Sequence, residues 1–378
     1  MAKILIFMLP EPGHLIPTFR VAMLLKDLGH TIEYLTVPDF RETITALGFG
    51  FRPFLSRLAG SGLGMGTVFE GGEAGTKIYA LLGSLLASEG VSAEEMITRD
   101  LIAGSPDLVI FDTDATVLWC RKSATASLES VGCPVLRVST TFTERSDSYA
   151  ASLPAFIRNL PELVLCPQEL DGPWATSAKH ERRYVEASIF RRRIKSVFPW
   201  EWLDRTRKLV YCSFGTQCRA YPTALSALQQ VIVTVGEMEE YQLVVTSDDE
   251  RISVNLPRNV LVRKSVPQLQ VLDRASVLIT HGGLGGIKEA ILARVPMIVI
   301  PFDHDQPLNA KRVEHRKLGV SLIDQKWLPK DLRHFIRYLP TDRTIHESGG
   351  HFHELFTRIE NDSPSVSYCE GLLRTGAS

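Results

Sequence analysis

Residues 276–291 read SVLITHGGLGGIKEAI, and the order of residue types in this stretch decides the fold class of the chain. Residues 276–280 are mostly apolar and β-branched, as in a strand that is buried on both faces. Glycine then occupies four of the five positions 282–286, and a helical segment begins near Gly285. A buried strand that turns through glycines into a helix is typical of a doubly wound α/β domain.

The same alternation of strand and helix continues on both sides of this stretch. Short apolar runs predict parallel strands, and amphipathic runs between them predict helices. The predicted strands are 3–9, 31–37, 106–112, 134–139, 209–214, 241–246, 259–266, 276–280, 296–300 and 320–323. The predicted helices are 15–28, 40–47, 222–237, 268–274, one that continues from the 106–112 strand, and two that begin near 285 and 305. Residues 60–75 are predicted to form a glycine-rich loop, and residues 141–202 and the tail after Leu339 show little regular pattern.

The length of the chain predicts two domains, because 378 residues exceed what one hydrophobic core usually supports. The alternation restarts after an irregular connection within residues 190–207. We therefore predict an α/β protein of two Rossmann-like domains that face each other across a cleft. The predicted boundaries are 1–198 for the N-terminal domain, 199–360 for the C-terminal domain and 361–378 for a tail that packs back on the N-terminal domain.

Composition and charge argue against several classes of protein. The 42 basic and 43 acidic residues give a net charge of −1, which offers no general attraction for nucleic acid or an anionic membrane. The run Arg191 to Arg193 is predicted to be a solvated face. The first apolar run, residues 4–9, is too short for a signal peptide or a membrane span, and no later run approaches the ~18 apolar residues of such a span. Six cysteines without metal-ligand spacing predict reduced thiols in a cytoplasmic protein.

The glycines at 282–286 admit two interpretations. They permit backbone N–H groups to approach an anion at a helix N-terminus, where His281 can donate a hydrogen bond to phosphates and Glu289 can accept from ribose hydroxyls. They are equally compatible with a tight turn in which glycine serves only packing. The spacing differs from GxGxxG and no Walker lysine follows, which argues against a dehydrogenase and a P-loop NTPase.

A second polar segment follows the next predicted strand. Residues 301–309 read PFDHDQPLN and place Asp305 and Gln306 at the carboxyl end of that strand. A carboxylate beside an amide supplies the acceptors and donors that neighbouring sugar hydroxyls require. Asp305 is also a natural N-cap for the helix that follows, and capping is compatible with sugar binding.

The whole segment 266–309, VPQLQVLDRASVLITHGGLGGIKEAILARVPMIVIPFDHDQPLN, resembles the nucleotide-sugar signature of the UDP-glycosyltransferase superfamily, of the bacterial natural-product type. The resemblance implies the GT-B fold, with an acceptor-binding N-terminal domain and a nucleotide-sugar-binding C-terminal domain. It extends over most of the chain, more loosely within residues 60–89 and 141–207.

The resemblance also implies roles for individual residues. His281 matches the histidine that contacts the diphosphate, Glu289 the glutamate that holds the ribose, and Asp305 with Gln306 the pair that binds hexose hydroxyls. Gln268 matches a position near the ribose and base, and the backbone of Val266 one that faces the base edge. Thr216 matches a Ser/Thr phosphate ligand. The implied donor-binding residues are therefore Thr216, Val266, Gln268, His281, Gly283, Gly285, Gly286, Glu289, Asp305 and Gln306.

Three positions depart from the family pattern. Ser265 stands where a tryptophan usually stacks on uracil, which leaves the choice of base open. Gly286 replaces a common Ser/Thr phosphate ligand and leaves only its backbone N–H. Arg294 stands where glycine is usual, a change at a helix end that is expected to have no catalytic effect.

The predicted catalytic group is His14, in the loop after the first strand. From the residues alone it is either a surface or capping histidine or a general base, since an imidazole with a pKa near ~6.5 accepts a proton at neutral pH. Residues 13–17, GHLIP, resemble the family segment whose histidine is the general base. The orienting acid of the family aligns with Asp112, and Asp114 is the alternative.

Two further groups suggest metal sites, and we expect neither to be one. Asp112, Thr113 and Asp114 form a DxD string of the kind that holds a divalent cation in metal-dependent glycosyltransferases. Every other donor-binding signal lies in the second half of the chain, so no metal and no other cofactor is expected. His346, His351 and His353 lie in the irregular tail, where solvated histidines are the expected outcome.

Together these features imply a metal-independent, inverting hexosyltransferase of secondary metabolism. The implied donor is UDP-glucose. The implied acceptor is a small hydrophobic metabolite with a hydroxyl group, an expectation supported by the apolar residues Phe49, Phe51, Phe54 and Phe142. The alternatives are a non-catalytic nucleotide-binding or partner-stabilising protein of the same fold, a nucleotide-sugar epimerase, and a lipid-linked sugar transferase. The residues Ser265 and Gly286 favour the first of these, whereas the retained site residues oppose it.

Overall fold

The chain divides into two compact units in a computed structural model. Unit 1 contains Met1–Phe190 and Asp362–Ser378, and unit 2 contains Arg191–Asn361. The structure describes residues 1–9, 11–53, 103–114, 131–142, 155–174, 182–192, 197–215, 218, 221, 223–252, 255–323 and 327–376.

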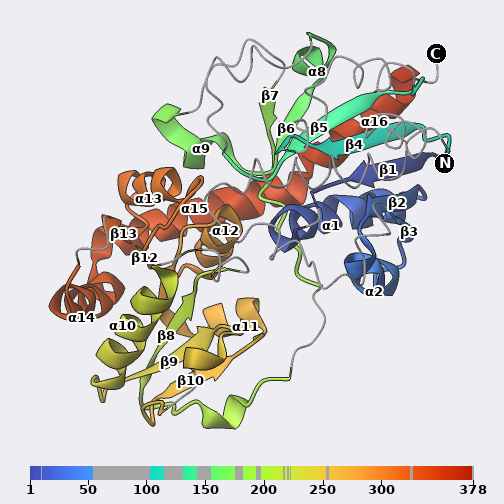
Figure 1. The fold of residues 1–378 in the computed structure, drawn as a ribbon. Coiled ribbons are helices and arrows are strands. Elements are labelled where there is room, and N and C mark those ends of the chain that lie inside the picture. Colours follow the sequence, from blue (N-terminus) through green and yellow to red (C-terminus); the bar gives the residue numbers. More distant parts are fainter. Residues whose placement is uncertain are drawn as a thin grey trace. The chain divides into compact units, whose positions relative to one another are not determined.

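Unit 1 is built on a parallel sheet of seven strands in the order β3-β2-β1-β4-β5-β6-β7 (Figure 1). The strands are β1 (Lys3–Phe7), β2 (Thr31–Thr36), β3 (Gly50–Pro53), β4 (Leu108–Asp112), β5 (Val135–Ser139), β6 (Glu162–Val164) and β7 (Arg182–Tyr184). β1 and β4 are adjacent, with Phe7 paired to Phe111. The segments that follow these two strands therefore emerge side by side at one edge of the sheet.

The helices of unit 1 include α1, which leads directly from the β1 edge. They are α1 (Pro12–Asp27), α2 (Arg41–Ala46), α8 (Ala155–Asn159), α9 (Gln168–Asp171) and α16 (Pro364–Gly376), with single 3₁₀ turns at Pro38–Phe40 and Gly172–Trp174. Phe19 of α1 packs edge-on against Tyr34 of β2 and against Phe190. α1 is thus held by the aromatic core of unit 1.

The C-terminal helix α16 belongs to unit 1 because a buried glutamate binds its first turn. Glu186 accepts hydrogen bonds from the backbone N–H of Ser365 (3.1 Å) and from Arg20 of α1 (3.2 Å). Arg20 also donates to Ser363, which precedes the helix (3.1 Å). A carboxylate at a helix N-terminus satisfies free N–H groups and the positive end of the dipole. The same network steadies α1, the helix that carries His14.

Unit 2 is built on a second parallel sheet, of six strands in the order β10-β9-β8-β11-β12-β13. The strands are β8 (Lys208–Ser213), β9 (Tyr241–Thr246), β10 (Val260–Arg263), β11 (Ala275–Thr280), β12 (Met297–Val299) and β13 (Gly319–Ser321). The helices are α10 (Ala224–Gly236), α11 (Gln268–Leu272), α12 (Leu284–Ala293), α13 (Gln306–His315), α14 (Pro329–Tyr338) and α15 (Arg343–Asp362), with 3₁₀ turns at Trp200–Trp202, Glu250–Ile252 and Leu339–Thr341.

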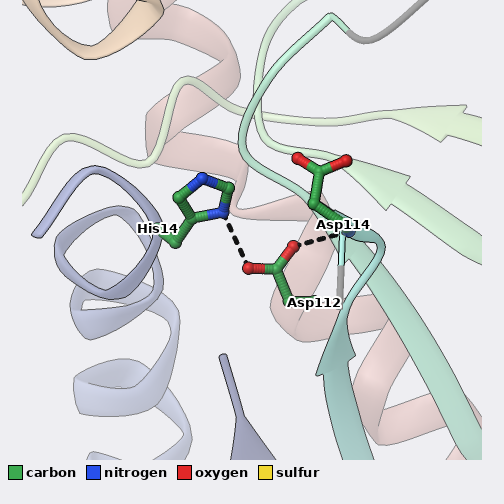
Figure 2. Close-up of side chains that lie close together, drawn as sticks. All are labelled: His14, Asp112 and Asp114. Atoms are coloured by element: carbon green, nitrogen blue, oxygen red, sulfur yellow. Dashed lines mark hydrogen bonds and ion pairs between the residues drawn. The ribbon is translucent and has the colours of Figure 1, made fainter. Parts of the chain in front are cut away.

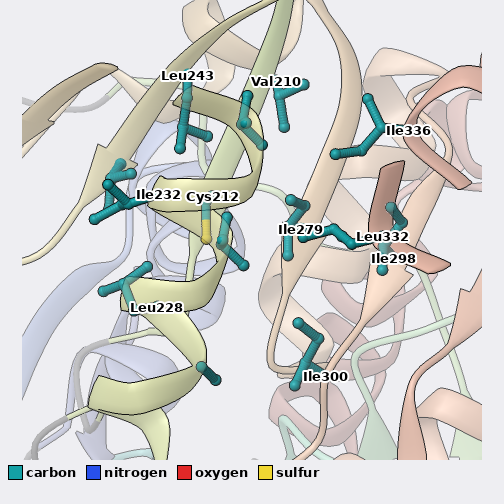
Figure 3. Packing of buried hydrophobic residues seen from close by; sticks show 14 of the residues in the cluster. Val210, Cys212, Leu228, Ile232, Leu243, Ile279, Ile298, Ile300, Leu332 and Ile336 are labelled. Carbon is teal, nitrogen blue, oxygen red and sulfur yellow. The ribbon is translucent and has the colours of Figure 1, made fainter. Parts of the chain in front are cut away.

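The core of unit 2 is aliphatic, as expected for a parallel sheet covered by helices (Figure 3). Leu228 and Ile232 of α10 lie with Leu243 of β9 in one buried cluster. Leu332 and Ile336 of α14 join the same cluster. Residues of β8, β11 and β12 belong to this cluster, and the loops after these strands carry several of the residues singled out in the sequence.

The predicted two-domain α/β fold with parallel sheets is confirmed. Two predictions of irregularity were wrong. Within residues 141–202 the chain adds β6 and, at the edge of the sheet, β7. Each strand has three residues, too few to show a pattern. The tail after Leu339 is helical, as α15 and α16. The pair Gly349 and Gly350 obscured α15, which is fixed by burial of Phe352 and Phe356 rather than by helix propensity.

Two predicted segments, the loop 60–75 and the helix after β4, lie outside the described residues. Among the helices in the described ranges, none is long and apolar enough to cross a membrane.

Candidate active site

His14 and Asp112 meet at the edge of the unit 1 sheet, although 98 residues separate them in sequence. His14 Nδ1 lies 2.7 Å from Asp112 Oδ2 (Figure 2). The prediction that His14 lies in a loop was wrong, since it sits in the first turn of α1. The helix begins at Pro12 because proline suits the first helical position, where its missing N–H costs nothing.

Asp112 is completely buried and its carboxylate accepts three hydrogen bonds. Oδ2 accepts from the backbone N–H of Leu9 (3.1 Å) and from His14, and Oδ1 accepts from the backbone N–H of Asp114 (2.8 Å). The carboxylate is therefore fixed in orientation. When the His14 ring is neutral, this arrangement keeps the hydrogen on Nδ1 and leaves the lone pair on Nε2.

The charges around His14 favour the imidazolium form of the free protein. Burial lowers the pKa of His14, but the charge of Asp112, its hydrogen bond and the charges of Asp114 and Glu11 outweigh burial. The result is a pKa raised to about 10. His14 must therefore lose this proton before it can act as a base.

A second carboxylate, Asp114, stands beside this pair. Thr141 donates to Asp114 Oδ2 (3.1 Å), and the Thr140 hydroxyl lies 3.3 Å from His14 Nδ1. Ligand atoms of His14, Asp112 and Asp114 lie within 4.8 Å of one another, and within the described residues this is the one group spaced for a metal ion. Both Asp112 oxygens and His14 Nδ1 are engaged in hydrogen bonds, an arrangement that suits a proton-transfer pair.

His346, His351 and His353 lie within α15, so the prediction of an irregular tail around them was wrong. His346 Nε2 bonds the carbonyl oxygen of Pro340 (2.8 Å), and His353 Nδ1 bonds that of Leu292 (2.7 Å). His351 is exposed. His346 and His353, which are seven residues apart, are each held by a backbone carbonyl group, and the described residues contain no metal-spaced group that includes any of the three.

In unit 2 the glycine turn joins β11 to α12 and surrounds His281. Gly282 has a φ of +92°, which favours glycine. A Cβ on Gly215 or on Gly283 would lie 2.7 Å or 2.6 Å from the nearest atom of the His281 ring. The two glycines therefore create the space that this imidazole fills. Gly285 and Gly286 open α12, and their Cβ positions are free of close contacts.

Burial keeps His281 neutral. It lowers the pKa of His281 to about 4, and a hydrogen bond with the backbone of Ser213 offsets only part of that effect. At neutral pH the ring is therefore uncharged and adds no positive charge at the turn.

A chain of hydrogen bonds leads from the core to Glu289. Tyr211 accepts from Thr246 (2.9 Å) and donates to Gln268 Oε1 (2.8 Å). Gln268 Nε2 in turn donates to Glu289 Oε2 (2.6 Å). The predicted residues Gln268 and Glu289 are thus in contact, and the buried Tyr211 orients them.

A second polar network organises the loop between β12 and α13. Asn309 is completely buried, donates to Gly282 O (2.9 Å) and to Asp305 Oδ2 (2.8 Å), and accepts from Arg312 (3.2 Å). It ties the glycine turn to Asp305. Gln306 is also buried, and it bonds the backbone of its own loop and the hydroxyl of Tyr221.

Known proteins resemble the chain in sequence. Residues 203–348, which lie within unit 2, match the family model described as UDP-glucoronosyl and UDP-glucosyl transferase. The chain is 25% identical to the NDP-glycosyltransferase YjiC of Bacillus subtilis (strain 168), over 98% of this chain and 94% of the relative. The protein is a glycosyltransferase.

Solved structures show that the glycosyltransferase has the GT-B fold. The calicheamicin glycosyltransferase CalG4 aligns with a TM-score of 0.72 at 19% identity, over 99% of this chain and 98% of that chain. The glycosyltransferase VinC in complex with dTDP aligns with a TM-score of 0.70 at 18% identity, over 99% of each chain.

The structure describes three of the four remaining donor-segment positions of the glycosyltransferase. Thr216 lies outside the described residues. Ser265 is exposed and Val266 is half-buried, and both lie beyond β10, which ends at Arg263. Arg294 adopts a φ of +56°, which explains why glycine suits this position.

Two of the four phenylalanines that were expected to favour an apolar acceptor, Phe49 and Phe142, do not line an open surface. Phe49 and Phe142 are buried, and Phe49 packs against Tyr34 with ring centroids 5.5 Å apart. Phe51 lies under the Arg41 guanidinium, and Phe54 is outside the described residues. A sequence shows only that such side chains are apolar, and the packing of the fold decides that Phe49 and Phe142 belong to the core.

Sequence reasoning missed three residues of the glycosyltransferase that organise the site, namely Tyr211, Tyr221 and Asn309. Tyr211 lies in the middle of an apolar strand, where the pattern indicates burial and nothing more. Asn309 closes the segment 301–309, and its spacing of four from Asp305 places both on one face of α13. That spacing was a usable signal. Tyr221 gave none, because its partner Gln306 is 85 residues away.

Proposed function

We propose that the enzyme transfers a hexose from a nucleotide-sugar to a hydroxyl group of a small hydrophobic metabolite, with inversion at the anomeric carbon. UDP-glucose is the proposed donor. The observation that carries this proposal is the 2.7 Å hydrogen bond between His14 and the buried carboxylate of Asp112. A histidine held in this way presents Nε2 as the proton acceptor.

The proposed reaction is a single displacement. Neutral His14 removes the proton of the acceptor hydroxyl at Nε2 while the acceptor oxygen forms its bond to the anomeric carbon. The bond from that carbon to the diphosphate oxygen breaks in the same step, and the electron pair leaves with the nucleoside diphosphate. Asp112 stabilises the imidazolium that forms. Attack from the side opposite the leaving group inverts the configuration.

The leaving diphosphate is assigned to the glycine turn. Backbone N–H groups of Gly283, Gly285 and Gly286 lie at the start of α12, where the helix dipole favours an anion. Neutral His281 and Thr216 add hydrogen bonds. These groups stabilise the charge that develops on the leaving group, so we propose that the reaction proceeds without a metal ion.

The nucleotide is assigned to Glu289, Gln268 and the Val266 backbone, with Glu289 accepting from the ribose. Ser265 is exposed and offers no ring to stack on a base, so the assay compares UDP donors with dTDP donors. The solved VinC complex contains dTDP, which makes that donor class a direct comparison.

A reducing, cytoplasmic compartment suits the proposed function. The described cysteines form no disulfide bond with one another; they are Cys133, Cys166, Cys212, Cys218 and Cys369. The acceptor class, a hydroxylated hydrophobic natural product, is proposed from likeness to glycosyltransferases such as CalG4.

Turnover of UDP-glucose and dTDP-glucose with a panel of hydroxylated hydrophobic acceptors tests the proposal. Wild type is compared with His14→Gln, Asp112→Asn and the matched control His351→Gln, an exposed histidine on α15. We expect transfer to fall by about 10²–10⁴-fold in the first two variants and to persist in the control.

The opposite outcomes separate the alternatives. Full activity of His14→Gln on an alcohol acceptor would show that His14 is not the base. Binding of UDP or dTDP without any transfer would favour the non-catalytic interpretation, which Ser265 and Gly286 support.

A further inference from the structure

Asn309 of α13 is completely buried inside unit 2 and joins two parts of its structure. The amide nitrogen donates to Gly282 O (2.9 Å) and to Asp305 Oδ2 (2.8 Å), so both of its N–H bonds are used. The amide oxygen accepts from Arg312 Nη1 (3.2 Å). The side chain therefore connects the glycine turn after β11 to the first turn of α13.

The orientation of this amide is determined by its partners. A guanidinium group only donates hydrogen bonds, whereas a carbonyl oxygen and a carboxylate only accept them. Arg312 therefore requires the oxygen of the Asn309 amide, and Gly282 and Asp305 require its nitrogen. A rotated amide would leave these buried groups without their hydrogen bonds, which is costly. The positive charge of Arg312 also polarises the amide and strengthens its hydrogen bond to Gly282.

The hydrogen bond to Gly282 O fixes the peptide group between Gly282 and Gly283. This peptide group is trans, and in a planar trans peptide the C=O and N–H bonds point in opposite directions. The carbonyl of Gly282 points to the buried Asn309, so the N–H of Gly283 points away from it. Gly282 is buried and Gly283 is half-buried, which means that this direction leads out of the interior.

A glycine turn needs such an external constraint. Gly282 has a φ of +92°, and glycine has no side chain that restricts rotation of its peptide groups. Gly283 is the N-cap of α12, so its N–H lies outside the hydrogen-bond pattern of the helix. The helix itself therefore does not aim this N–H, whereas the contact of Asn309 with Gly282 does.

The direction of the Gly283 N–H matters because the neighbouring histidine is uncharged. A Cβ on Gly283 would lie 2.6 Å from His281 Nε2, so this position adjoins the ring. Burial lowers the pKa of His281 to about 4, and the ring is neutral at neutral pH. An anion at the turn is therefore attracted by aimed backbone N–H groups and by the dipole of α12, not by a charge on this imidazole.

We propose that Asn309 is a positioning residue for the leaving diphosphate: it holds Gly282 O inward so that the Gly283 N–H meets a phosphate oxygen. The inference rests on the proposed function and deepens it. Because Asn309 is completely buried, it acts through this one peptide group and not by contact with the donor.

The affinity gained from the phosphate groups tests this role. Dissociation constants of UDP and uridine, and of dTDP and thymidine, are measured by calorimetry for wild type, Asn309→Ala and Asn259→Ala. Asn259 is the matched control, since it is also buried and its amide nitrogen hydrogen-bonds the backbone carbonyl groups of Val235, Met238 and Tyr241. It precedes β10, whereas the glycine turn follows β11, so the two asparagines serve opposite edges of a parallel sheet.

We expect Asn309→Ala to lower the ratio of the uridine to the UDP dissociation constant by about 10–100-fold, because an aimed hydrogen bond to a charged oxygen is lost. Uridine itself should bind within about threefold of wild type. Asn259→Ala should lower Tm, as Asn309→Ala does, but leave the ratio within about threefold. A role in folding alone would lower Tm in both variants and change the ratio in neither.

Wild type alone supplies a second measurement, which counts even if Asn309→Ala does not fold. In NMR spectra of protein with isotopically labelled glycine, UDP should shift the amide proton of Gly283 to lower field, and uridine should not. An unchanged Gly283 amide in protein saturated with UDP would overturn the positioning role.

Failure of this inference differs from failure of the proposed function. If wild type transfers hexose and Asn309→Ala keeps the wild-type ratio, Asn309 serves folding alone and the inference is wrong. If wild type binds neither diphosphate more tightly than its nucleoside and transfers no hexose, the proposed function fails, and the diphosphate site that Asn309 would serve fails with it.

Discussion

At the scale of single residues, the carboxylates near His14 determine when it can accept a proton. Asp112 orients the ring, whereas Asp114 and Glu11 add negative charge that favours the imidazolium. Asp112 thus both orients the ring and contributes most to the rise in its pKa, whereas Asp114 and Glu11 affect the pKa alone.

The pH dependence of kcat/KM should report this arrangement. The pKa of His14 is raised to about 10, so the neutral, reactive ring becomes more abundant as pH rises from 7 towards 10. We expect kcat/KM to rise over that range. Asp114→Asn removes one of the charges that raise the pKa of His14 and should move the rising limb to lower pH. Glu42→Gln, an exposed change in α2, is the control. A profile that is flat in wild type, or unmoved by Asp114→Asn, contradicts this account.

His281 should make the protein less stable in mild acid. Its pKa is about 4 in the folded protein and about 6.5 in the unfolded chain, so only the unfolded chain takes up a proton between these values. The free energy of unfolding should fall by up to about 3 kcal/mol as pH decreases from 6.5 to 4. Urea unfolding at several pH values measures this slope.

His281→Gln should flatten that slope, because glutamine does not titrate. His351→Gln, which changes an exposed histidine, should leave the slope as in wild type. Equal slopes in His281→Gln and wild type would mean that another group is responsible.

At the scale of elements, the end of α12 contains a local strain. Arg294 follows the helix in the left-handed conformation, with φ +56° and ψ +34°, and its N–H caps the carbonyl groups of Ala290 and Ile291. Side chains other than glycine adopt this conformation at a cost of about 1 kcal/mol. The end of α12 therefore carries a residue type that its backbone conformation does not favour.

Arg294→Gly should stabilise unit 2. We expect a gain of about 1 kcal/mol and a rise in Tm of about 2–4 °C, since glycine adopts a positive φ without strain. Arg294→Ala retains the Cβ and should show no such gain, which makes it the matched control. Differential scanning calorimetry measures both, and equal Tm values for the two variants would exclude backbone strain as the cause.

At the scale of the whole molecule, the polar and charged groups of the proposed site are divided between the two units. Asp112 and Asp114 lie in unit 1, whereas the glycine turn, His281 and Glu289 lie in unit 2. The proposed stabilisation of the diphosphate by backbone N–H groups needs no metal bridge.

Removal of metal ions should therefore leave transfer intact. We expect the rate in excess chelator to stay within about twofold of the untreated rate, because hydrogen bonds from the α12 turn meet the leaving charge. The assay compares chelator alone with chelator followed by Mg²⁺ or Mn²⁺. The DxD string would instead be assigned to a metal if chelator abolished activity, Mn²⁺ restored it in wild type, and Mn²⁺ failed to restore it in Asp114→Asn.

The sequence by itself determined most of the strand–helix order, the parallel α/β character of both halves and the glycine turn at 282–286. These features depend on local patterns, since burial on both faces selects apolar runs and a positive φ selects glycine. The donor segment 266–309 is continuous in the chain, so most of its residues could be named without coordinates.

Only the tertiary structure decided which side chains meet. The hydrogen bond of His14 to Asp112 spans 98 residues, that of Gln306 to Tyr221 spans 85, and that of Ser365 to Glu186 spans 179. Such partners are chosen by packing of elements that are remote in sequence, and no local pattern records that choice. The same packing placed Phe49 and Phe142 in the core and turned the amide of Gln306 inward, because a buried amide must satisfy its hydrogen bonds within the protein.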